Sequence, residues 1–206
     1  MKRLCVSLTI LLAGLFAVSS TASAATVVKM DMPDLVAQSD AIVIAQVVEY
    51  SSQLEEDGRV YTTITFRTDE VLKGQPGEEF TIRQVGGRDG DIATRAPGMP
   101  TFEEDEEVFL FLTHHQSTSV VTGLSQGKFH IAIGPDDQTR FVVPQIHGIH
   151  LVERGTTADE RSEAVKAQGP HLSLQDHASV FRQVHEFQTF RRQVERTIEW
   201  QNEAVQ

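Results

Sequence analysis

The strongest catalytic pattern in the sequence is a Gly-x-Ser-x-Gly match that places Ser125 between Gly123 and Gly127. In hydrolases this pattern holds a nucleophilic serine on a sharp turn between a strand and a helix. The residues that follow it here, 128–133, alternate in the manner of a strand, so the required helix is missing. A serine hydrolase that uses Ser125 and a histidine therefore remains an alternative, while the context favours a connection between strands.

Histidines are the residues that could bind a metal, and the chain has eight of them. Three pairs are close in sequence: His114 with His115, His147 with His150, and His177 with His185. Adjacent residues on a strand point to opposite faces, a spacing of three suits a helix but not a strand, and eight helical residues span about 12 Å. No His-Glu-x-x-His motif or set of three ligands appears. We expect surface or packing histidines, no metal and no cofactor.

Two acidic stretches could attract calcium. Residues 103–107 are five consecutive acids, which do not wrap an ion as a calcium loop does. We interpret them as a solvated turn that leads into a strand. Asp136 and Asp137 are interpreted as turn residues that hydrogen-bond their own backbone.

A glycine-rich stretch is the place where we expect contact with a partner. Glycine lets backbone N–H groups approach an anion, and neighbouring arginines could add charge-assisted hydrogen bonds. The stretch lacks the Gly-Lys-Ser/Thr ending of a phosphate loop, so nucleotide binding is not indicated. The alternative is a loop whose glycines are needed only for positive φ. The candidate residues are Gly86, Gly87, Arg88, Asp89, Gly90 and Arg95. They begin a long irregular connection, residues 86–102, of the kind that often carries function.

A β domain must position these residues. Alternation of apolar and polar residues predicts about seven short strands. They lie at residues 41–48, 60–68, 80–85, 108–112, 120–124, 127–133 and 139–143. The first and fourth are apolar on both alternating sets, which predicts burial of both faces. A short helix is predicted over residues 30–39, with Pro33 in its first turn and Leu35 and Val36 turned inward. Residues 25–152 form one domain in this interpretation.

The C-terminal region is predicted to be a linker followed by a helix. Residues 153–171 are polar and without periodicity, which indicates a linker. Residues 172–206 form an amphipathic helix, with Ser173 as its N-cap. Its apolar face comprises Val180, Val184, Phe187, Val194 and Ile198. We expect this face to pack on the β domain, and the alternative is dimerisation or partner binding through the helix.

The N-terminus has the pattern of a secretory signal peptide. Lys2 and Arg3 precede an apolar run over residues 4–18, and Ala22-Ser23-Ala24 supplies the small residues of a cleavage site. We expect residues 1–24 to be removed and the mature chain to begin at Ala25, in the periplasm or outside the cell. An uncleaved anchor is the alternative, but the apolar run is short for a span.

Cleavage would also change the chemistry of the chain. The only cysteine, Cys5, lies in the predicted signal peptide, so the mature chain would have no disulfide, thiolate metal site or catalytic cysteine. Residues 1–24 hold two bases and no acid, so their removal lowers the formal charge from −11 to −13. A chain this acidic is repelled by nucleic acids and anionic membranes.

Three segments, residues 39–47, 61–67 and 71–74, resemble the opening of the TIMP/netrin-like domains. The longer series through Gly86-Gly87, Pro97-Gly98, residues 108–112 and residues 123–129 resembles a group of uncharacterised secreted bacterial proteins. This second likeness covers residues 35–143. The resemblance implies an OB-type barrel, which is antiparallel, partly open and of Greek-key topology.

The best-known activity of that family does not transfer directly. Tissue inhibitors of metalloproteases chelate the protease zinc with a disulfide-tied N-terminal cysteine, whereas the mature chain would begin Ala25-Thr26-Val27-Val28. A free amine on Ala25 could still reach a metal, but no bridge would hold it rigid. We therefore expect a secreted, non-enzymatic binding module for a protein or cell-envelope ligand, with metalloprotease inhibition as one form of it. Hydrolysis at Ser125 is the hypothesis from another class.

Overall fold

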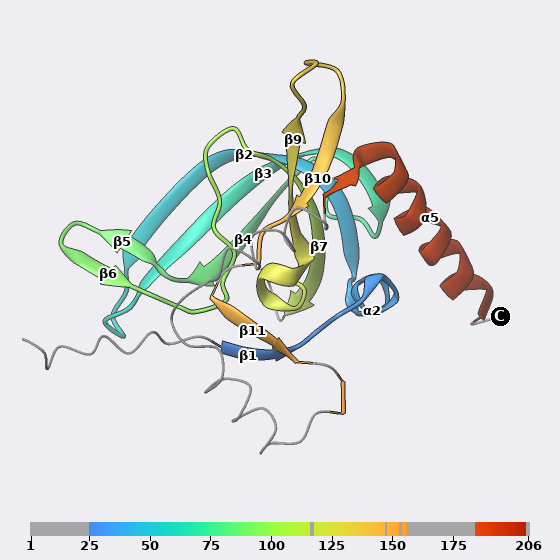
Figure 1. Cartoon of the computed structure of the whole chain (residues 1–206). Coiled ribbons are helices and arrows are strands. Elements are labelled where there is room, and N and C mark those ends of the chain that lie inside the picture. The colour runs from blue at the N-terminus through green and yellow to red at the C-terminus, as the bar shows by residue number, and fades with distance from the viewer. Residues whose placement is uncertain (1–24, 116–117, 147, 153, 156–183, 205–206) are drawn as a thin grey trace, which may run out of the picture.

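The computed structural model describes residues 25–115, 118–146, 148–152, 154–155 and 184–204. These residues are mainly β structure and end in a helix, as the sequence predicted (Figure 1). The predicted signal peptide, all but two residues of the predicted linker and the predicted Ser173 cap lie outside the described residues. No helix among the described residues is long and apolar enough to cross a membrane.

The described elements follow one another in this order: β1 (Ala25–Val28), α2 (Met32–Gln38), β2 (Ala41–Leu54), β3 (Val60–Lys73), β4 (Glu79–Val85), β5 (Gly87–Asp89), β6 (Ile92–Thr94), β7 (Glu107–His115), β8 (Thr118–Val121), the 3-10 helix η1 (Leu124–Gly127), β9 (Lys128–Ile133), β10 (Arg140–Pro144), β11 (Ile149–Val152), β12 (His185–Glu186) and α5 (Phe187–Ala204).

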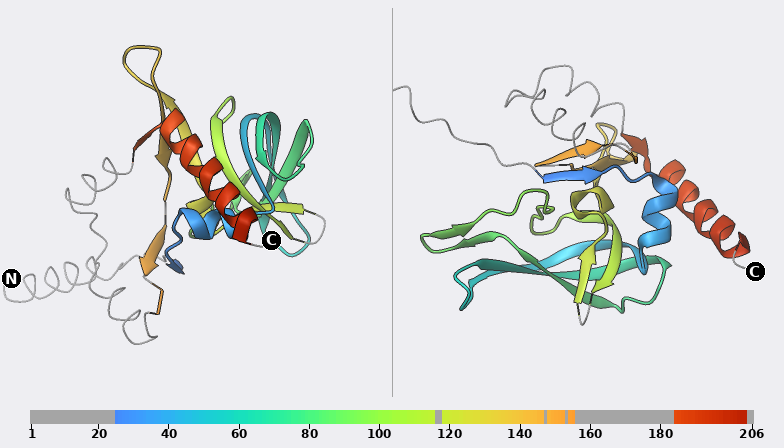
Figure 2. Two further views of the ribbon diagram at one scale, coloured as in Figure 1. Left: turned by 90° about the vertical axis from the view of Figure 1, so that its right-hand side faces the viewer. Right: turned by 90° about the horizontal axis from the view of Figure 1, so that it is seen from below.

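Eight strands form the main sheet in the order β12-β10-β9-β7-β2-β3-β4-β8. β7 pairs with β8 as well, so β7, β2, β3, β4 and β8 form a closed series of pairings. All neighbours in the sheet are antiparallel except β4 and β8, which are parallel at Ile82 and Ser119. Two small sheets stand apart: parallel β1–β11, which forms a separate layer in Figure 2, and antiparallel β5–β6.

Residues 41–47 of β2 and residues 108–112 of β7 are buried on both faces, as their continuous apolar character predicted. Val43 and Leu110 belong to one core cluster, and Ile42 and Phe109 belong to a second cluster on the opposite face of the same strands. The first cluster fills the space enclosed by β2, β3, β4, β7 and β8 and includes Phe66 and Phe102. The second cluster lies under α2 and α5.

α5 packs on the main sheet through its apolar face. Phe187, Phe190 and Val194 are buried there, and the ring of Phe190 lies 5.1 Å from that of Phe109 and 4.9 Å from that of Phe129, centroid to centroid. The described part of the C-terminal helix therefore docks on its own chain. The prediction of helix was wrong at His185 and Glu186, which pair with Val142 and Phe141 of β10.

The start of α5 has a local cause. The carboxylate of Glu186 accepts hydrogen bonds from the backbone amides of Gln188, at 2.9 Å, and Thr189, at 2.8 Å. These amides have no partner within the helix, and a carboxylate at a helix N-terminus also interacts favourably with the helix dipole. The bonds lower the pKa of Glu186, with the Gln188 amide as the largest cause.

Other boundaries differ from the predicted ones. β2 continues to Leu54 and β3 to Lys73, so the two strands form a long twisted hairpin. The predicted strand over residues 120–124 ends at Val121, because the chain turns through Gly123 at φ +66° into η1. The connection over residues 86–102, predicted to be irregular, contains the β5–β6 hairpin. α2 matches its prediction, with Asp31 accepting a 2.9 Å hydrogen bond from the Asp34 amide.

Candidate functional site

The predicted glycine-rich stretch forms a short hairpin that projects at the end of the molecule opposite α5 (Figure 1). In β5–β6, Gly87 pairs with Thr94, Arg88 with Ala93 and Asp89 with Ile92. Arg88, Asp89 and Gly90 are exposed, and so is Arg95 just after the hairpin. Neither Arg88 nor Arg95 has an ion pair or hydrogen bond with another described residue, so both guanidinium groups are available to a ligand.

The base of the hairpin is fixed to the β2–β3 hairpin by hydrogen bonds. The Gly86 amide donates to Val60 O at 2.9 Å, and the Val60 amide donates to Thr94 Oγ1 at 2.8 Å. Near the tip, the Leu54 amide donates to Asp89 Oδ2 at 2.9 Å. The Gly86 amide is thus engaged within the protein and is not available to an anion. Arg88 and Arg95 remain candidate ligand contacts.

Gly87 is required by a close approach to the neighbouring hairpin. A Cβ atom on Gly87 would lie 2.4 Å from Thr62 Oγ1 and 2.7 Å from Ser52 Oγ. These two hydroxyls are 2.8 Å apart, and Thr62 Oγ1 also donates to Gly86 O at 2.7 Å. Gly86 and Gly87 have φ values of +121° and +125°, which only glycine adopts readily. The positive φ values and the close contact with β2 and β3 therefore account for these two glycines.

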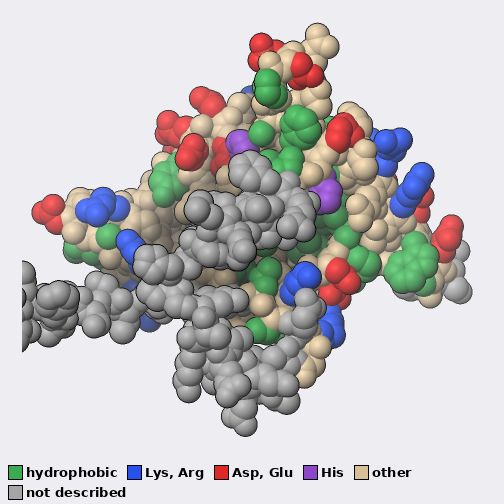
Figure 3. Space-filling view, in the orientation of Figure 1, with side chains coloured by type: hydrophobic (Ala, Val, Ile, Leu, Met, Phe, Trp, Pro, Cys, Tyr) green, Lys and Arg blue, Asp and Glu red, His purple; other side chains and the backbone are tan. Residues whose placement is uncertain are grey.

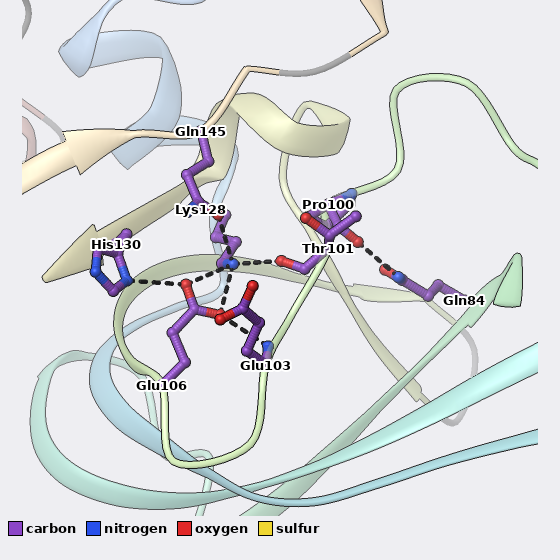
Figure 4. A network of polar contacts seen from close by, with 8 residues as sticks. All are labelled: Gln84, Pro100, Thr101, Glu103, Glu106, Lys128, His130 and Gln145. Carbon is purple, nitrogen blue, oxygen red and sulfur yellow. Dashed lines mark hydrogen bonds and ion pairs between the residues drawn. The ribbon is translucent and has the colours of Figure 1, made fainter. Parts of the chain in front are cut away.

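A buried polar cluster behind the same connection was not predicted (Figure 4). Lys128, on β9, is buried, and its Nζ lies 2.8 Å from both carboxylate oxygens of Glu106. Nζ also donates to Gln145 Oε1 at 2.8 Å and to the carbonyl oxygen of Thr101, and it lies 4.3 Å from the ring centroid of Phe102. Burial lowers the pKa of Lys128, and the Glu106 carboxylate opposes that shift.

Glu106 also connects His130 and the backbone of Glu103 to this cluster. Its Oε1 is 3.0 Å from His130 Nδ1, and its Oε2 accepts a 3.1 Å hydrogen bond from the Glu103 amide. The expected solvated turn is therefore correct for the exposed residues 103–105 and wrong for buried Glu106. With all three hydrogen-bond positions of its ammonium occupied, Lys128 has no room for a substrate. The cluster fixes the end of the connection that starts at the hairpin.

The serine of the Gly-x-Ser-x-Gly pattern is inaccessible. Ser125 lies in η1, is 0% exposed, and its Oγ has no hydrogen-bond partner in the described part of the chain. No imidazole is thus in place to take its proton, and β9 follows directly. This geometry is that of a packed turn beneath residue Gly98, whose carbonyl accepts a 3.0 Å hydrogen bond from the Ser125 amide.

The described histidines do not assemble into a metal centre. His114 Nδ1 is 3.1 Å from Ser119 Oγ, while His130 contacts Glu106. Within the described ranges, no group of three or more His, Cys, Asp and Glu residues could hold a metal ion. His147 and His177 lie outside those ranges.

Comparison with known proteins gave no match to a family model, a curated protein or a solved structure.

Proposed function

We propose that this protein is an exported, non-enzymatic binding module that contacts a protein or cell-envelope ligand through the β5–β6 hairpin. One observation carries the proposal: the hairpin is exposed, yet it is fixed at its base by the Val60 hydrogen bonds and at its tip by Asp89. A surface held in one conformation loses little entropy on binding. Arg88 and Arg95 would contact acidic or hydrogen-bond-accepting groups of the ligand.

The pairing pattern supports an OB-type barrel for this module. β2, β3, β4, β8 and β7 follow one another around a closed series, and the one parallel pair is β4–β8. This order, antiparallel except where the third and fifth strands meet, is that of a five-stranded Greek-key barrel. The resemblance to TIMP/netrin-like domains points to the same fold. Because one fold serves many functions, the binding proposal depends on the hairpin and not on the barrel.

Metalloprotease inhibition is the second candidate, and the position of Ala25 favours it. The Ala25 amide nitrogen donates to Gly148 O at 3.1 Å, and β1 pairs with β11 throughout its length. A Cβ atom on Gly98 would lie 3.7 Å from the Cβ of Ala25. If the chain is cleaved before Ala25, its new amine lies beside the Pro97-Gly98 part of the connection. Strand pairing would then hold the amine in place without a disulfide.

Affinity capture from the cells that make the protein tests the main proposal. The bait is the protein produced from the complete sequence, and the variant is Arg88→Ala/Arg95→Ala, which leaves Gly86, Gly87 and Asp89 intact. The matched control is Arg67→Ala, at an exposed arginine of β3 that lies outside the hairpin. A partner lost with the double variant and kept with the control would support the proposal. Partners retained by the double variant would overturn it.

The inhibitor form needs a separate assay. A chain that begins at Ala25 should slow cleavage by a zinc metalloprotease, while one extra residue before Ala25 should abolish the effect by displacing the amine. Equal inhibition by both chains would exclude chelation through Ala25.

A further inference from the structure

A groove lies between α5 and the start of α2, far from the β5–β6 hairpin. It has a volume of about 530 Å³ and is lined by Pro33, Thr189, Arg192, Gln193, Arg196, Thr197 and Trp200. Gln201 Nε2 donates to Pro33 O at 2.8 Å, which joins the two helices at the end of the groove. The lining has two cations and no anion. In Figure 3, basic side chains lie on this side of the molecule, over α5.

The two arginines of the groove differ from their neighbour Arg191. Arg191 is engaged by the carboxylates of Glu70 and Glu195, and these contacts raise its pKa. Arg192 donates only to the carbonyl oxygen of Gln188 in its own helix, at 3.2 Å. Arg196 has no ion pair or hydrogen bond among the described residues. Arg192 and Arg196 also line an adjacent hollow that contains Glu70, Glu195 and Glu199, but neither forms an ion pair with a described carboxylate. Two such guanidinium groups in one groove are suited to binding carboxylates.

Trp200 completes the groove with an apolar surface. Its side chain is 61% exposed, and it is the only tryptophan in the chain. Burial of aromatic side chains contributes strongly to binding, and Trp and Arg are the residues most enriched among those that dominate binding energy. An exposed indole beside two available guanidinium groups therefore marks a site for a ligand with both anionic and apolar parts.

The spacing of these residues matches an extended peptide. Arg192, Arg196 and Trp200 are four residues apart on α5, so successive side chains are displaced by about 6 Å along the helix axis. Alternate side chains of an extended peptide are displaced by about 6.8 Å on one face. A peptide with the pattern acidic-x-acidic-x-apolar would thus place its two acidic side chains opposite Arg192 and Arg196 and its apolar side chain opposite Trp200.

We propose that this groove binds an extended acidic peptide segment of a partner protein, with two carboxylates on the arginines and an apolar side chain on Trp200. The site is independent of the hairpin. The overall formal charge of −11 does not prevent such binding, because physiological salt screens charges beyond about 8 Å. The same net negative charge disfavours binding to an anionic membrane surface, because the many charges of that surface would repel the protein as a whole.

The intrinsic fluorescence of Trp200 provides the signal for a binding test. The protein produced from the complete sequence is titrated with a synthetic peptide, Gly-Glu-Ser-Glu-Ser-Leu-Gly, while tryptophan fluorescence is recorded. We expect a saturable blue shift as the exposed indole is covered. The matched peptide Gly-Gln-Ser-Gln-Ser-Leu-Gly should bind at least about tenfold more weakly, since each charged hydrogen bond contributes a factor of that size.

Variants decide which residues bind. Arg196→Ala and Arg192→Ala should each weaken binding of the Glu peptide by about tenfold or more, and Arg59→Ala, at an exposed arginine in the turn between β2 and β3, should leave it unchanged. Thermal unfolding shows whether each variant is folded. Equal binding of the Glu and Gln peptides, or normal binding to Arg196→Ala, would overturn the proposal.

Two further measurements distinguish the acidic peptide from other occupants of the groove. If vesicles of phosphatidylglycerol shift the fluorescence and the Glu peptide does not, the groove binds a lipid surface and the peptide proposal is wrong. If sedimentation shows self-association that Arg196→Ala abolishes, and the Glu peptide does not compete with it, a second copy of the chain is the occupant instead.

Discussion

The ammonium of Lys128 lies 2.8 Å from the carboxylate of Glu106, and only 1% and 5% of the two side chains are exposed. The pair joins β9 to the turn before β7, and the Thr101 carbonyl brings in the end of the connection that starts at Gly86. Buried charges are costly to desolvate, so a pair of this kind is sensitive to the loss of either member. This ion pair thus helps to fix the end of the connection, together with the hydrogen bond from Gln84 Nε2 to the Pro100 carbonyl.

Lys128→Met should lower the free energy of unfolding by about 3–5 kcal/mol, because the buried carboxylate of Glu106 loses its ammonium partner. The double variant Lys128→Met/Glu106→Leu should recover most of that loss, since it removes both charges. Urea unfolding measures both effects. The control is Arg83→Met, which breaks the exposed Arg83–Glu55 pair, with side chains 43% and 42% exposed, and should cost no more than about 1 kcal/mol. Similar losses for Lys128→Met and Arg83→Met would contradict this account.

Gly87→Ala should be far more damaging than Gly90→Ala. At Gly87 a methyl group would lie 2.4 Å from Thr62 Oγ1 at a φ of +125°, whereas Gly90, at +55°, has no atom within 4 Å of its Cβ position. We expect a loss of roughly 2–5 kcal/mol at Gly87 and about 1–2 kcal/mol at Gly90, measured by urea unfolding. Equal losses would show that the hairpin does not need its close contact with β3.

Local patterns were sufficient to predict seven of the eight strands that form the main sheet, the exception being β12. β2 and β7 have apolar residues on both alternating sets, and both are buried on two faces, one toward Phe66 and the other toward Phe190. The helix α2 followed from Pro33 in its first turn, and the described part of the final helix followed from its apolar periodicity. These features depend on residues close in sequence, so the sequence shows them directly.

Features that depend on distant partners were missed. The pairing of β1 with β11 joins Ala25 to Ile149, and neither segment alternates clearly enough to predict it. Lys128 is a single base in an otherwise regular strand, and only the fold places Glu106 against it. A lysine at an inward position of an apolar strand is a signal that could have been noticed, but it does not identify the partner. The β5–β6 hairpin was missed because its strands have three residues each.

The turn between β9 and β10 allows a test of pH dependence. Hydrogen bonds from the Thr139 hydroxyl, the Thr139 amide and the Gln138 amide lower the pKa of Asp136 from 3.8 to about 2. A carboxyl group with a folded-state pKa below its unfolded value stabilises the fold above the unfolded value, and that contribution is lost as the pH falls from about 4 toward 2. NMR titration of the Asp136 carboxyl carbon measures this pKa.

Thr139→Val keeps the branched shape of the side chain and removes its hydroxyl, which is the largest cause of the shift. The pKa of Asp136 should therefore rise toward 3.8 in this variant. The difference in stability between the two proteins should be constant near neutral pH and decrease in acid. An unchanged titration curve in Thr139→Val would assign the shift to the backbone amides alone.

Ser125→Ala distinguishes the binding module from the hydrolase. The Ser125 hydroxyl is buried and unpaired, so it pays a desolvation cost of about 1–3 kcal/mol without a compensating hydrogen bond. Its removal should leave the free energy of unfolding unchanged or raise it by about 1 kcal/mol. The control is Ser39→Ala. Ser39 is equally inaccessible, but its Oγ donates to Leu35 O at 2.7 Å and lies 2.9 Å from Thr122 Oγ1. That variant should lose about 1–2 kcal/mol.

The same pair of variants tests catalysis. A buried serine without a base cannot react with a fluorophosphonate, so the folded protein should stay unlabelled and Ser125→Ala should retain every binding property of the parent. Labelling of the folded parent that disappears in Ser125→Ala, but persists in Ser39→Ala, would overturn the non-enzymatic proposal. Labelling of Ser125 would also require η1 to open, because Ser125 is 0% exposed in the present conformation.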